Sequence, residues 1–245
     1  MVADSTNESG PQVRTYDRLE AVVFLRTRDA FGGLSNMASG FELSVNGIHI
    51  LTSEALYQAC RFPHLPEVQR LIVRQSSPMA AKMKSKPFRP ESRSDWDAVR
   101  VKVMRWCLRV KLTQHWTTFS ELLLDTGVRP IVEESRRDEF WGAKPIGEAA
   151  LKGTNALGRL LMELRSEVLE GGQDRFEEVL PLSIPDFWLY GEPIAPVSRH
   201  EAPPARAAAP ARPREDRSMR RSGGVQIENP RQRTLAEWLL PDEDA

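Results

Sequence analysis

The stretch SDWDAVRVKVMRWCLRV (residues 94–110) shows a helical pattern with a defined start. Its first four residues resemble a capping box, in which side chains satisfy the free N–H groups at a helix N-terminus. The apolar residues that follow are spaced by four, three and four positions: Val99, Val103, Trp106 and Val110. This spacing places them on one face of a helix. The stretch therefore predicts a helix with one buried side.

Shorter helices are predicted on either side of it. Thr52-Ser53 offers an N-cap for a helix through Phe62, and a proline begins each of the next two. The ranges predicted after that N-cap are 66–75, 78–84, 118–124 (ended by Gly127) and 153–169. In the last of these, Leu157, Leu160, Leu161 and Leu164 share one side.

Little β-structure is expected, and it lies near the start. Residues 21–25 form an apolar, strand-like run. Residues 41–45 and 48–51 flank Asn46-Gly47, a pair that favours a tight hairpin because both residues tolerate positive φ. We therefore predict an α+β fold that is mainly helical and has a small N-terminal β-hairpin element.

Composition excludes several classes of protein. The 245 residues contain 34 basic and 34 acidic side chains, so the chain is not a uniformly basic nucleic-acid binder. The two cysteines and four histidines are too scattered to predict a disulfide scaffold or a metal site. No apolar run reaches the roughly 18 residues of a membrane span, and the N-terminus lacks the apolar segment of a signal peptide. A cytoplasmic location, no cofactor and no membrane partner are expected.

The composition also predicts how the chain is divided. Residues 1–18 are expected to be a flexible N-terminus and residues 19–168 the folded core domain, followed by a proline-interrupted extension over 169–197. Residues 198–233 hold nine arginines against four acidic residues and are rich in Ala and Pro, a composition typical of a disordered linker. Residues 234–245 turn apolar and then acidic, as a short docking segment does.

A glycine loop and a helix start are the first two candidate functional segments. In FGGLSN (residues 31–36), Gly32 and Gly33 allow a backbone to approach a ligand closely, or form an ordinary turn. In TSEALYQ (residues 52–58), Glu54 is either a helix-capping residue or a functional carboxylate. Tyr57 lies one helical turn further on, on the same side.

A lysine-bearing helix and an aromatic segment are the other two. SSPMAAKMKSK (residues 76–86) combines a helix start with three lysines, which suits either a phosphate site or a solvated helix end. DEFWG (residues 138–142) places two aromatic residues between an acidic pair and a glycine. That arrangement fits either a pocket wall with a carboxylate beside it or a core tryptophan at a junction.

The order of these segments resembles a known family. FGGLSNM, TSEALYQACRF, SSPMAAKM, a helix begun by Trp, DEFWG and GTNALGRLLMELR together look like the NADAR (YbiA-like) family over residues 20–168. The resemblance implies a mainly helical fold and an N-glycosidase that acts on ribosylated or ADP-ribosylated nitrogen. Its implied catalytic residues are Glu54, facing the ribose, and Asp138, which would act as second carboxylate, hold a ribose hydroxyl or position Trp141.

The same resemblance suggests binding residues. Gly32, Gly33 and Asn36 would approach the ribose or phosphate, and Lys82 would neutralise a pyrophosphate. Tyr57 and Trp141, with Gly142 next to it, would wall the base, and Asn155 would hydrogen-bond a hydroxyl. This scheme requires no metal.

The resemblance is strongest to the branch that removes ADP-ribose from guanine in DNA and serves as antitoxin to an ADP-ribosyltransferase toxin. The substrate would then be ADP-ribosylated DNA, with a cognate toxin as partner. The arginine-rich tail would attract DNA or act as a linker, and residues 232–239 loosely resemble a sliding-clamp-binding peptide. Two alternatives remain: an N-glycosidase for phosphoribosylated riboflavin-pathway intermediates, and a module that binds ADP-ribose or NAD without cleaving it. Paired carboxylates argue against the second.

Overall fold

The structure is a computed structural model that describes residues 12–201. The α-helices are α1 (Ser53–Ala59), α2 (Pro66–Val73), α3 (Pro78–Ser85), α4 (Trp96–Gln114), α5 (Trp116–Leu124) and α6 (Ala156–Gly171). The 3₁₀ helices are η1 (Gly32–Leu34), η2 (Lys86–Glu91), η3 (Gln173–Phe176) and η4 (Arg199–Glu201). The fold class is α+β, as the sequence predicts.

The strands are short and form separate small sheets. An antiparallel sheet has the order β1-β7-β6, made of β1 (Arg14–Asp17), β7 (Ala150–Gly153) and β6 (Lys144–Ile146). β2 (Val22–Phe24) pairs in parallel with β5 (Ile131–Glu133), and β3 (Leu43–Val45) pairs antiparallel with β4 (Ile48–Ile50). Two further antiparallel pairs lie in the C-terminal part of the described residues: β8 (Glu178–Val179) with β11 (Val197–Ser198), and β9 (Trp188–Leu189) with β10 (Glu192–Pro193).

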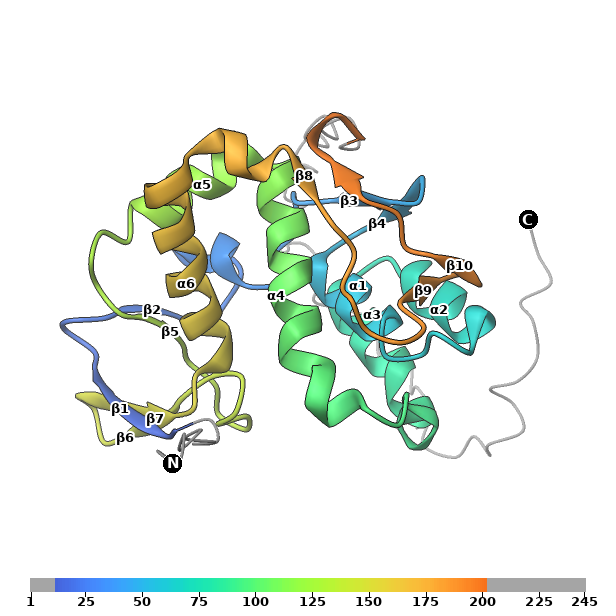
Figure 1. Ribbon diagram of the computed structural model, residues 1–245. Coiled ribbons are helices and arrows are strands. Elements are labelled where there is room, and N and C mark those ends of the chain that lie inside the picture. Colours follow the sequence, from blue (N-terminus) through green and yellow to red (C-terminus); the bar gives the residue numbers. More distant parts are fainter. Residues whose placement is uncertain (1–11, 202–245) are drawn as a thin grey trace, which may run out of the picture. The chain divides into compact units, whose positions relative to one another are not determined.

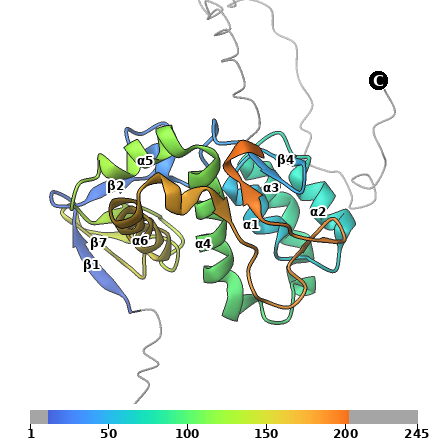
Figure 2. The same cartoon turned by 45° about the horizontal axis from the view of Figure 1, so that its top comes forward.

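The helix α4 lies at the centre of the described part of the chain. Figure 1 shows it between two groups of elements: α6 with the β2–β5 and β1-β7-β6 strands, and α1, α2 and α3 with the β3–β4 hairpin. Figure 2 shows the same arrangement from another direction. All four residues of the predicted apolar stripe are buried: Val99, Val103, Trp106 and Val110. Met104 and Leu108, which lie on the opposite face, are buried as well, so α4 packs on both sides and not only on the predicted one.

Local signals in the sequence account for several helix starts. The Thr52 side chain accepts a hydrogen bond from the Ala55 N–H at 3.3 Å, and that of Ser77 accepts one from the Ala80 N–H at 3.1 Å. Both are N-caps of the kind expected. At α4 the capping interaction is absent among the described residues, because Asp95 instead forms an ion pair with Arg93 at 2.5 Å.

The structure corrects the N-terminal boundary and the start of the last helix. Residues 14–17 belong to β1 and pair with β7, so they are not part of a flexible N-terminus. Residue 153 ends β7, and α6 begins only after Asn155. The φ of Asn155 is 50°, which lies outside the helical region, so the helix cannot start earlier. Both errors arise because the pairing of β1 joins residues that are far apart in sequence, which local patterns do not encode.

The proline-interrupted extension packs onto the core. Phe187 stacks edge-on against Trp106 at 4.9 Å between ring centroids, and the Trp106 indole N–H donates to the Leu180 carbonyl. Residues of the extension that join the main apolar cluster are Phe176, Val179, Phe187, Leu189, Ile194 and Val197. The predicted linker boundary at residue 198 is too early, because Ser198 pairs in β11 and Arg199 forms an ion pair with Glu177 at 2.9 Å. The predictions for residues 1–11 and 202–245, which include the rest of the arginine-rich linker and the docking segment, lie outside the described residues.

Within residues 12–201, none of the helices has the combined length and apolar character that a membrane crossing needs.

Candidate active site

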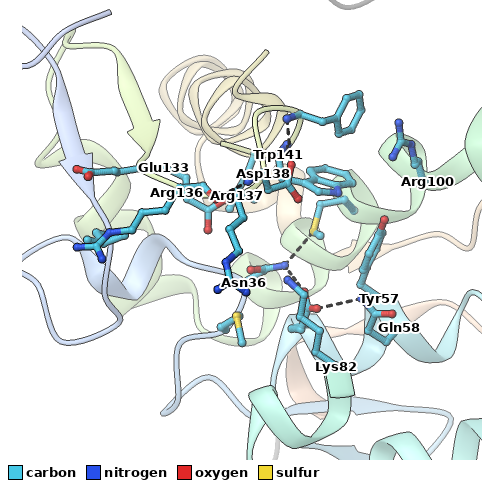
Figure 3. A pocket seen from close by; sticks show the side chains of 18 of the residues that line it. Asn36, Tyr57, Gln58, Lys82, Arg100, Glu133, Arg136, Arg137, Asp138 and Trp141 are labelled. Carbon is cyan, nitrogen blue, oxygen red and sulfur yellow. Dashed lines mark hydrogen bonds between the residues drawn. The ribbon is translucent and has the colours of Figure 1, made fainter. Parts of the chain in front are cut away.

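A cavity of about 560 Å³ opens between α1, α3 and α4 on one side and the segment that follows β5 on the other. Figure 3 shows its side chains, with Gln58, Tyr57 and Lys82 on one wall and Asp138 and Trp141 on the other. Six residues singled out from the sequence line this cavity: Asn36, Glu54, Tyr57, Lys82, Asp138 and Trp141. The structure therefore gathers segments that are up to a hundred residues apart.

Glu54 is a buried carboxylate held from two sides. It is 3% exposed and lies in the first turn of α1. The Asn36 side-chain amide donates to its Oε2 at 2.6 Å, and the Gln58 amide donates to its Oε1 at 3.0 Å. The Ser85 hydroxyl in turn donates to Gln58 Oε1 at 2.8 Å. This chain of hydrogen bonds fixes the carboxylate and its negative charge at the cavity wall.

Glu133 is a second carboxylate in the cavity, at the end of β5. The pKa of Glu133 is raised to about 7, chiefly by burial and also by the nearby charges of Glu54 and Asp138, against the opposing effect of Lys82. Two carboxylates in one cavity therefore differ in surroundings. At neutral pH a substantial fraction of Glu133 carries a proton and is able to donate it.

Asp138 organises the loop that carries the aromatic wall. One carboxylate oxygen, Oδ1, accepts the backbone N–H groups of Phe140 at 3.0 Å and Trp141 at 2.9 Å. Its own N–H donates to the Ser135 hydroxyl at 3.0 Å. Of the roles that the resemblance implies for Asp138, this geometry favours the positioning of Trp141.

Aromatic rings form a continuous row beside the two glutamates. Tyr57 lies 5.0 Å from Trp96 and 5.6 Å from Trp141, centroid to centroid, and Trp141 lies 5.1 Å from Phe140. Burial raises the pKa of Tyr57, with the charge of Glu54 acting in the same direction, so its phenol stays neutral. Trp96 and Tyr57 are only 5% and 4% exposed, so the half-buried Trp141 and Phe140 supply most of the ring surface that a nucleobase could meet.

Positive charge predominates around the cavity. Four acidic side chains line it, and one of them, Glu134, is paired with Arg18 at 2.9 Å. The basic side chains in its lining are Arg61, Lys82, Arg89, Arg100, Arg136 and Arg137. This lining suits an anionic ligand such as a phosphate ester.

The NADAR domain profile matches residues 23–169. The chain belongs to the NADAR domain family. Over 146 residues it is 38% identical to the N-glycosidase YbiA of Escherichia coli (strain K12), a match that covers 59% of this chain and 86% of YbiA. The NMR structure of Escherichia coli YbiA superposes with a TM-score of 0.52 at 35% identity, covering 62% of this chain and 90% of that one. This NADAR domain therefore has a fold similar to that of YbiA.

Other relatives carry two kinds of name. An N-glycosidase of Nostoc punctiforme is 32% identical over 154 residues, covering 60% of this chain and 92% of that protein. A riboflavin biosynthesis protein of Vibrio vulnificus is 32% identical over 158 residues, covering 64% of this chain but only 41% of that protein.

The predicted glycine loop of the NADAR domain supports the site from behind and does not line the cavity. A Cβ on Gly32 would lie 2.4 Å from the Thr27 carbonyl, and one on Gly33 would lie 2.7 Å from a Leu122 methyl group. The ammonium group of buried Lys111 donates to the Gly33 carbonyl at 2.6 Å, although burial lowers the pKa of Lys111 well below its usual value. The glycines are thus needed for packing, and only the loop's last residue, Asn36, reaches the cavity.

Gly142 and Asn155 also lie outside the cavity lining. A Cβ on Gly142 would lie 2.5 Å from the Glu133 carbonyl oxygen, so glycine allows the two segments to approach. The Asn155 amide donates to the Ile131 carbonyl at 2.8 Å and accepts the Glu133 N–H at 3.2 Å. Both ends of this side chain therefore bond to the backbone of β5. Asn155 holds that strand in place and does not reach the substrate hydroxyl that the resemblance implies for it.

Sequence reasoning missed Glu133 and all of the cavity arginines. Glu133 ends a three-residue strand, too short for a recognisable period. Arg136 and Arg137 directly precede the DEFWG segment, and this adjacency was the available signal. Within residues 12–201, no group of three or more His, Cys, Asp or Glu side chains is arranged to hold a metal ion.

Proposed function

We propose that this NADAR domain is an N-glycosidase that hydrolyses the bond between C1′ of a ribose and the nitrogen of a base. The observation that carries the proposal is Glu54, a buried carboxylate fixed by Asn36 and Gln58 at the wall of a basic, aromatic-lined cavity. The names of several relatives, including YbiA, describe the same class of reaction.

The chemistry of the bond explains why such a carboxylate is needed. Cleavage develops positive charge on the ribose, and a negative group fixed beside C1′ stabilises that charge without reorganising. Glu54 is suited to this role because both of its oxygens are held by amide N–H groups. It also orients the water whose oxygen bonds to C1′ and accepts the proton that this water releases.

The departing base requires a proton of its own. The electron pair of the C1′–N bond moves to the base nitrogen, and Glu133 donates the proton that neutralises it. Its raised pKa of about 7 supports this assignment, because an acid of that pKa is partly protonated at neutral pH and gives up its proton readily. The proton taken up by Glu54 replaces it after product release, so the cycle closes.

The other cavity residues support a phosphorylated substrate with a flat base. Lys82 on α3, with Arg136 and Arg137 opposite, would bind a pyrophosphate, and Tyr57 with Trp141 would pack against the base. We propose ADP-ribose attached to guanine in DNA as this substrate, because the basic lining provides for more than one phosphate. On this proposal the protein reverses the action of a DNA ADP-ribosyltransferase and serves as its antitoxin in the cytoplasm.

A second candidate substrate rests on the relatives. The Vibrio vulnificus relative and one from Zea mays are named as riboflavin biosynthesis proteins. A phosphoribosylated intermediate of that pathway has the same C1′–N bond and a single phosphate. Its hydrolysis would depend on Glu54 in the same way. Its single phosphate would leave some of the basic side chains of the cavity without a phosphate partner.

The substrate and the carboxylate are tested together. Purified protein is incubated with DNA that carries ADP-ribosylated guanine, and in parallel with a phosphoribosylated pyrimidine, and release of the free sugar phosphate is followed by mass spectrometry. Glu54→Gln should reduce turnover on the order of a thousandfold, because the shape is kept and the charge is lost. Binding of ADP-ribose, measured by calorimetry, should change little.

A matched control is Glu67→Gln, which removes an exposed carboxylate on α2. This variant should retain wild-type turnover. Full activity of Glu54→Gln would refute the mechanism. Cleavage of the phosphoribosylated pyrimidine alone would replace DNA as substrate, and binding of ADP-ribose with no cleavage of either would identify a binding module.

A further inference from the structure

The basic side chains of the cavity fall into two groups. Lys82, Arg136 and Arg137 form the group assigned above to the pyrophosphate. The second group lies on the helical side, where Arg61 follows α1, Arg89 belongs to η2 and Arg100 belongs to α4. In Figure 3, Arg100 lies on the far side of Tyr57 and Trp141 from Asn36 and Arg137. Arg100 therefore faces a different part of the cavity from Arg137.

Two arginines of the second group are fixed by stacking on aromatic rings. The Arg61 guanidinium lies 4.7 Å from the centroid of Trp96, and that of Arg100 lies 3.8 Å from the centroid of Phe140. Both side chains are partly buried, and the Nε of each has no hydrogen-bond partner among residues 12–201. Stacking of this kind holds the guanidinium plane, and because Nε is shielded in both side chains, contact with an anion falls to the terminal Nη groups.

The positive charges of this group are poorly compensated by the protein. Burial lowers the pKa of Arg61 most, and the positive charges of Arg89 and Arg100 lower it as well, against opposing effects of Tyr57 and Asp97. The ion pair of Arg100 is with Asp97, at 3.7 Å, whose side chain is 93% exposed. Such a solvated pair contributes little. A bound phosphate would relieve the repulsion.

The aromatic row joins this group to the glutamates. It runs from Trp96 through Tyr57 and Trp141 to Phe140, with Arg61 stacked at one end and Arg100 at the other. Aromatic rings beside arginines form the usual surface for an unpaired nucleic-acid strand, where bases stack and the backbone meets positive charge.

We infer that Arg61, Arg89 and Arg100 bind the phosphodiester of the strand that carries the modified base. Phe140 would stack with a flanking base, while Trp141 keeps its place against the modified base. This inference rests on the proposed function and adds to it which residues hold the DNA strand, and that the strand is unpaired around the modified base. A modified guanine has to leave the base stack before C1′ reaches Glu54, and single-stranded DNA meets that requirement directly.

The test compares one modified base in two contexts. Values of kcat/KM are measured for ADP-ribosylated guanosine and for a single-stranded oligonucleotide with the same modification, using wild type, Arg61→Gln, Arg89→Gln and Arg100→Gln. Each substitution should lower the ratio of oligonucleotide to nucleoside kcat/KM about tenfold. The slope of log kcat/KM against log salt for the oligonucleotide should become shallower by about 0.7.

Two variants separate this effect from general damage. Arg74→Gln removes an exposed arginine at the end of α2, outside the cavity lining, and should leave the ratio unchanged. Arg89 is exposed and stacks on no ring among the described residues, unlike Arg61 and Arg100. If substitution of the two stacked arginines prevents folding, Arg89→Gln alone still measures the contribution of this group to strand binding.

The outcomes distinguish the inference from the proposed function. If both substrates are cleaved and the three substitutions lower kcat/KM equally for both, these arginines bind the ADP-ribose itself and the inference is wrong while the function stands. An unchanged ratio in all three variants also refutes it. If wild type cleaves neither substrate, the proposed function fails.

Discussion

At the scale of single residues, the proposed mechanism depends on two cavity glutamates in different surroundings. Glu54 has both oxygens engaged by amides, whereas Glu133 is partly buried at a strand end between other acidic groups. The sequence predicts Glu54, because the helix start TSE is a local signal, but it does not predict Glu133. The environment of Glu133 comes first from its burial and then from the approach of Glu54 and Asp138, and local sequence patterns specify none of these.

The raised pKa of Glu133 predicts a pH dependence of stability. The folded value of about 7 exceeds the ordinary value of 4.5, so between these two pH values the native state binds more protons than the unfolded state. The free energy of unfolding should therefore fall as pH rises through this window, by about 1–3 kcal/mol. Glu133→Gln should abolish that loss and be more stable than wild type at pH 8.

Denaturant unfolding at pH 5 and pH 8 measures this difference, and kinetics supply a second measurement. Wild-type kcat should decline above pH 7 as Glu133 loses its proton, and Glu133→Gln should lose both the decline and most of the activity. Equal stability gains at both pH values would show that the side chain is unprotonated throughout, contrary to the assignment as proton donor.

At the scale of elements, local sequence patterns predict the helices of this fold better than its strands. The caps Thr52 and Ser77 act within one turn of their helices, and the apolar stripe of α4 repeats often enough to be recognised. The strands are two to four residues long, and β2 pairs with β5 more than a hundred residues away. Their partners are set by packing, so the strand that carries Glu133 was missed.

Asn155 is the residue that fixes this strand, and its substitution tests the connection. Its φ of 50° suits glycine, so Asn155→Gly keeps the backbone conformation and removes only the hydrogen bonds to Ile131 and Glu133. The loss of these buried bonds should destabilise the fold by about 2–4 kcal/mol. Turnover should fall because Glu133 is no longer held in place.

Thermal unfolding and steady-state kinetics on Asn155→Gly measure the two effects separately. Gly40 is a useful reference, since it also has positive φ and a Cβ there would meet no neighbour within 4 Å. Gly40→Asn should therefore cost little stability and leave turnover intact. Wild-type turnover in Asn155→Gly would show that Glu133 does not depend on this contact.

At the scale of the whole molecule, the core extends beyond the family match. The NADAR profile ends at residue 169, yet the side chains of the following segment complete the apolar cluster around α4. The sequence indicates the composition of this segment, with its prolines and short apolar pieces, but not its contacts. Gln69, for instance, donates to the Trp188 carbonyl at 2.9 Å and accepts the Tyr190 N–H at 2.6 Å, across some 120 residues.

Truncation tests whether the extension is part of the folding unit. A chain that ends at residue 169 loses the buried side chains Phe176, Val179, Phe187, Leu189, Ile194 and Val197. Each contributes about 1.5–3 kcal/mol by burial, and the sum is comparable to the whole stability of an ordinary domain, about 5–15 kcal/mol. The truncated chain should therefore fail to unfold cooperatively in calorimetry and should bind a hydrophobic dye. A chain that ends at residue 201 is its control, because it keeps every contact described between residues 12 and 201 and should retain a cooperative transition and wild-type turnover. Cooperative unfolding of the shorter chain near the wild-type temperature would show that residues 23–169 fold alone and that the extension only covers a core already formed.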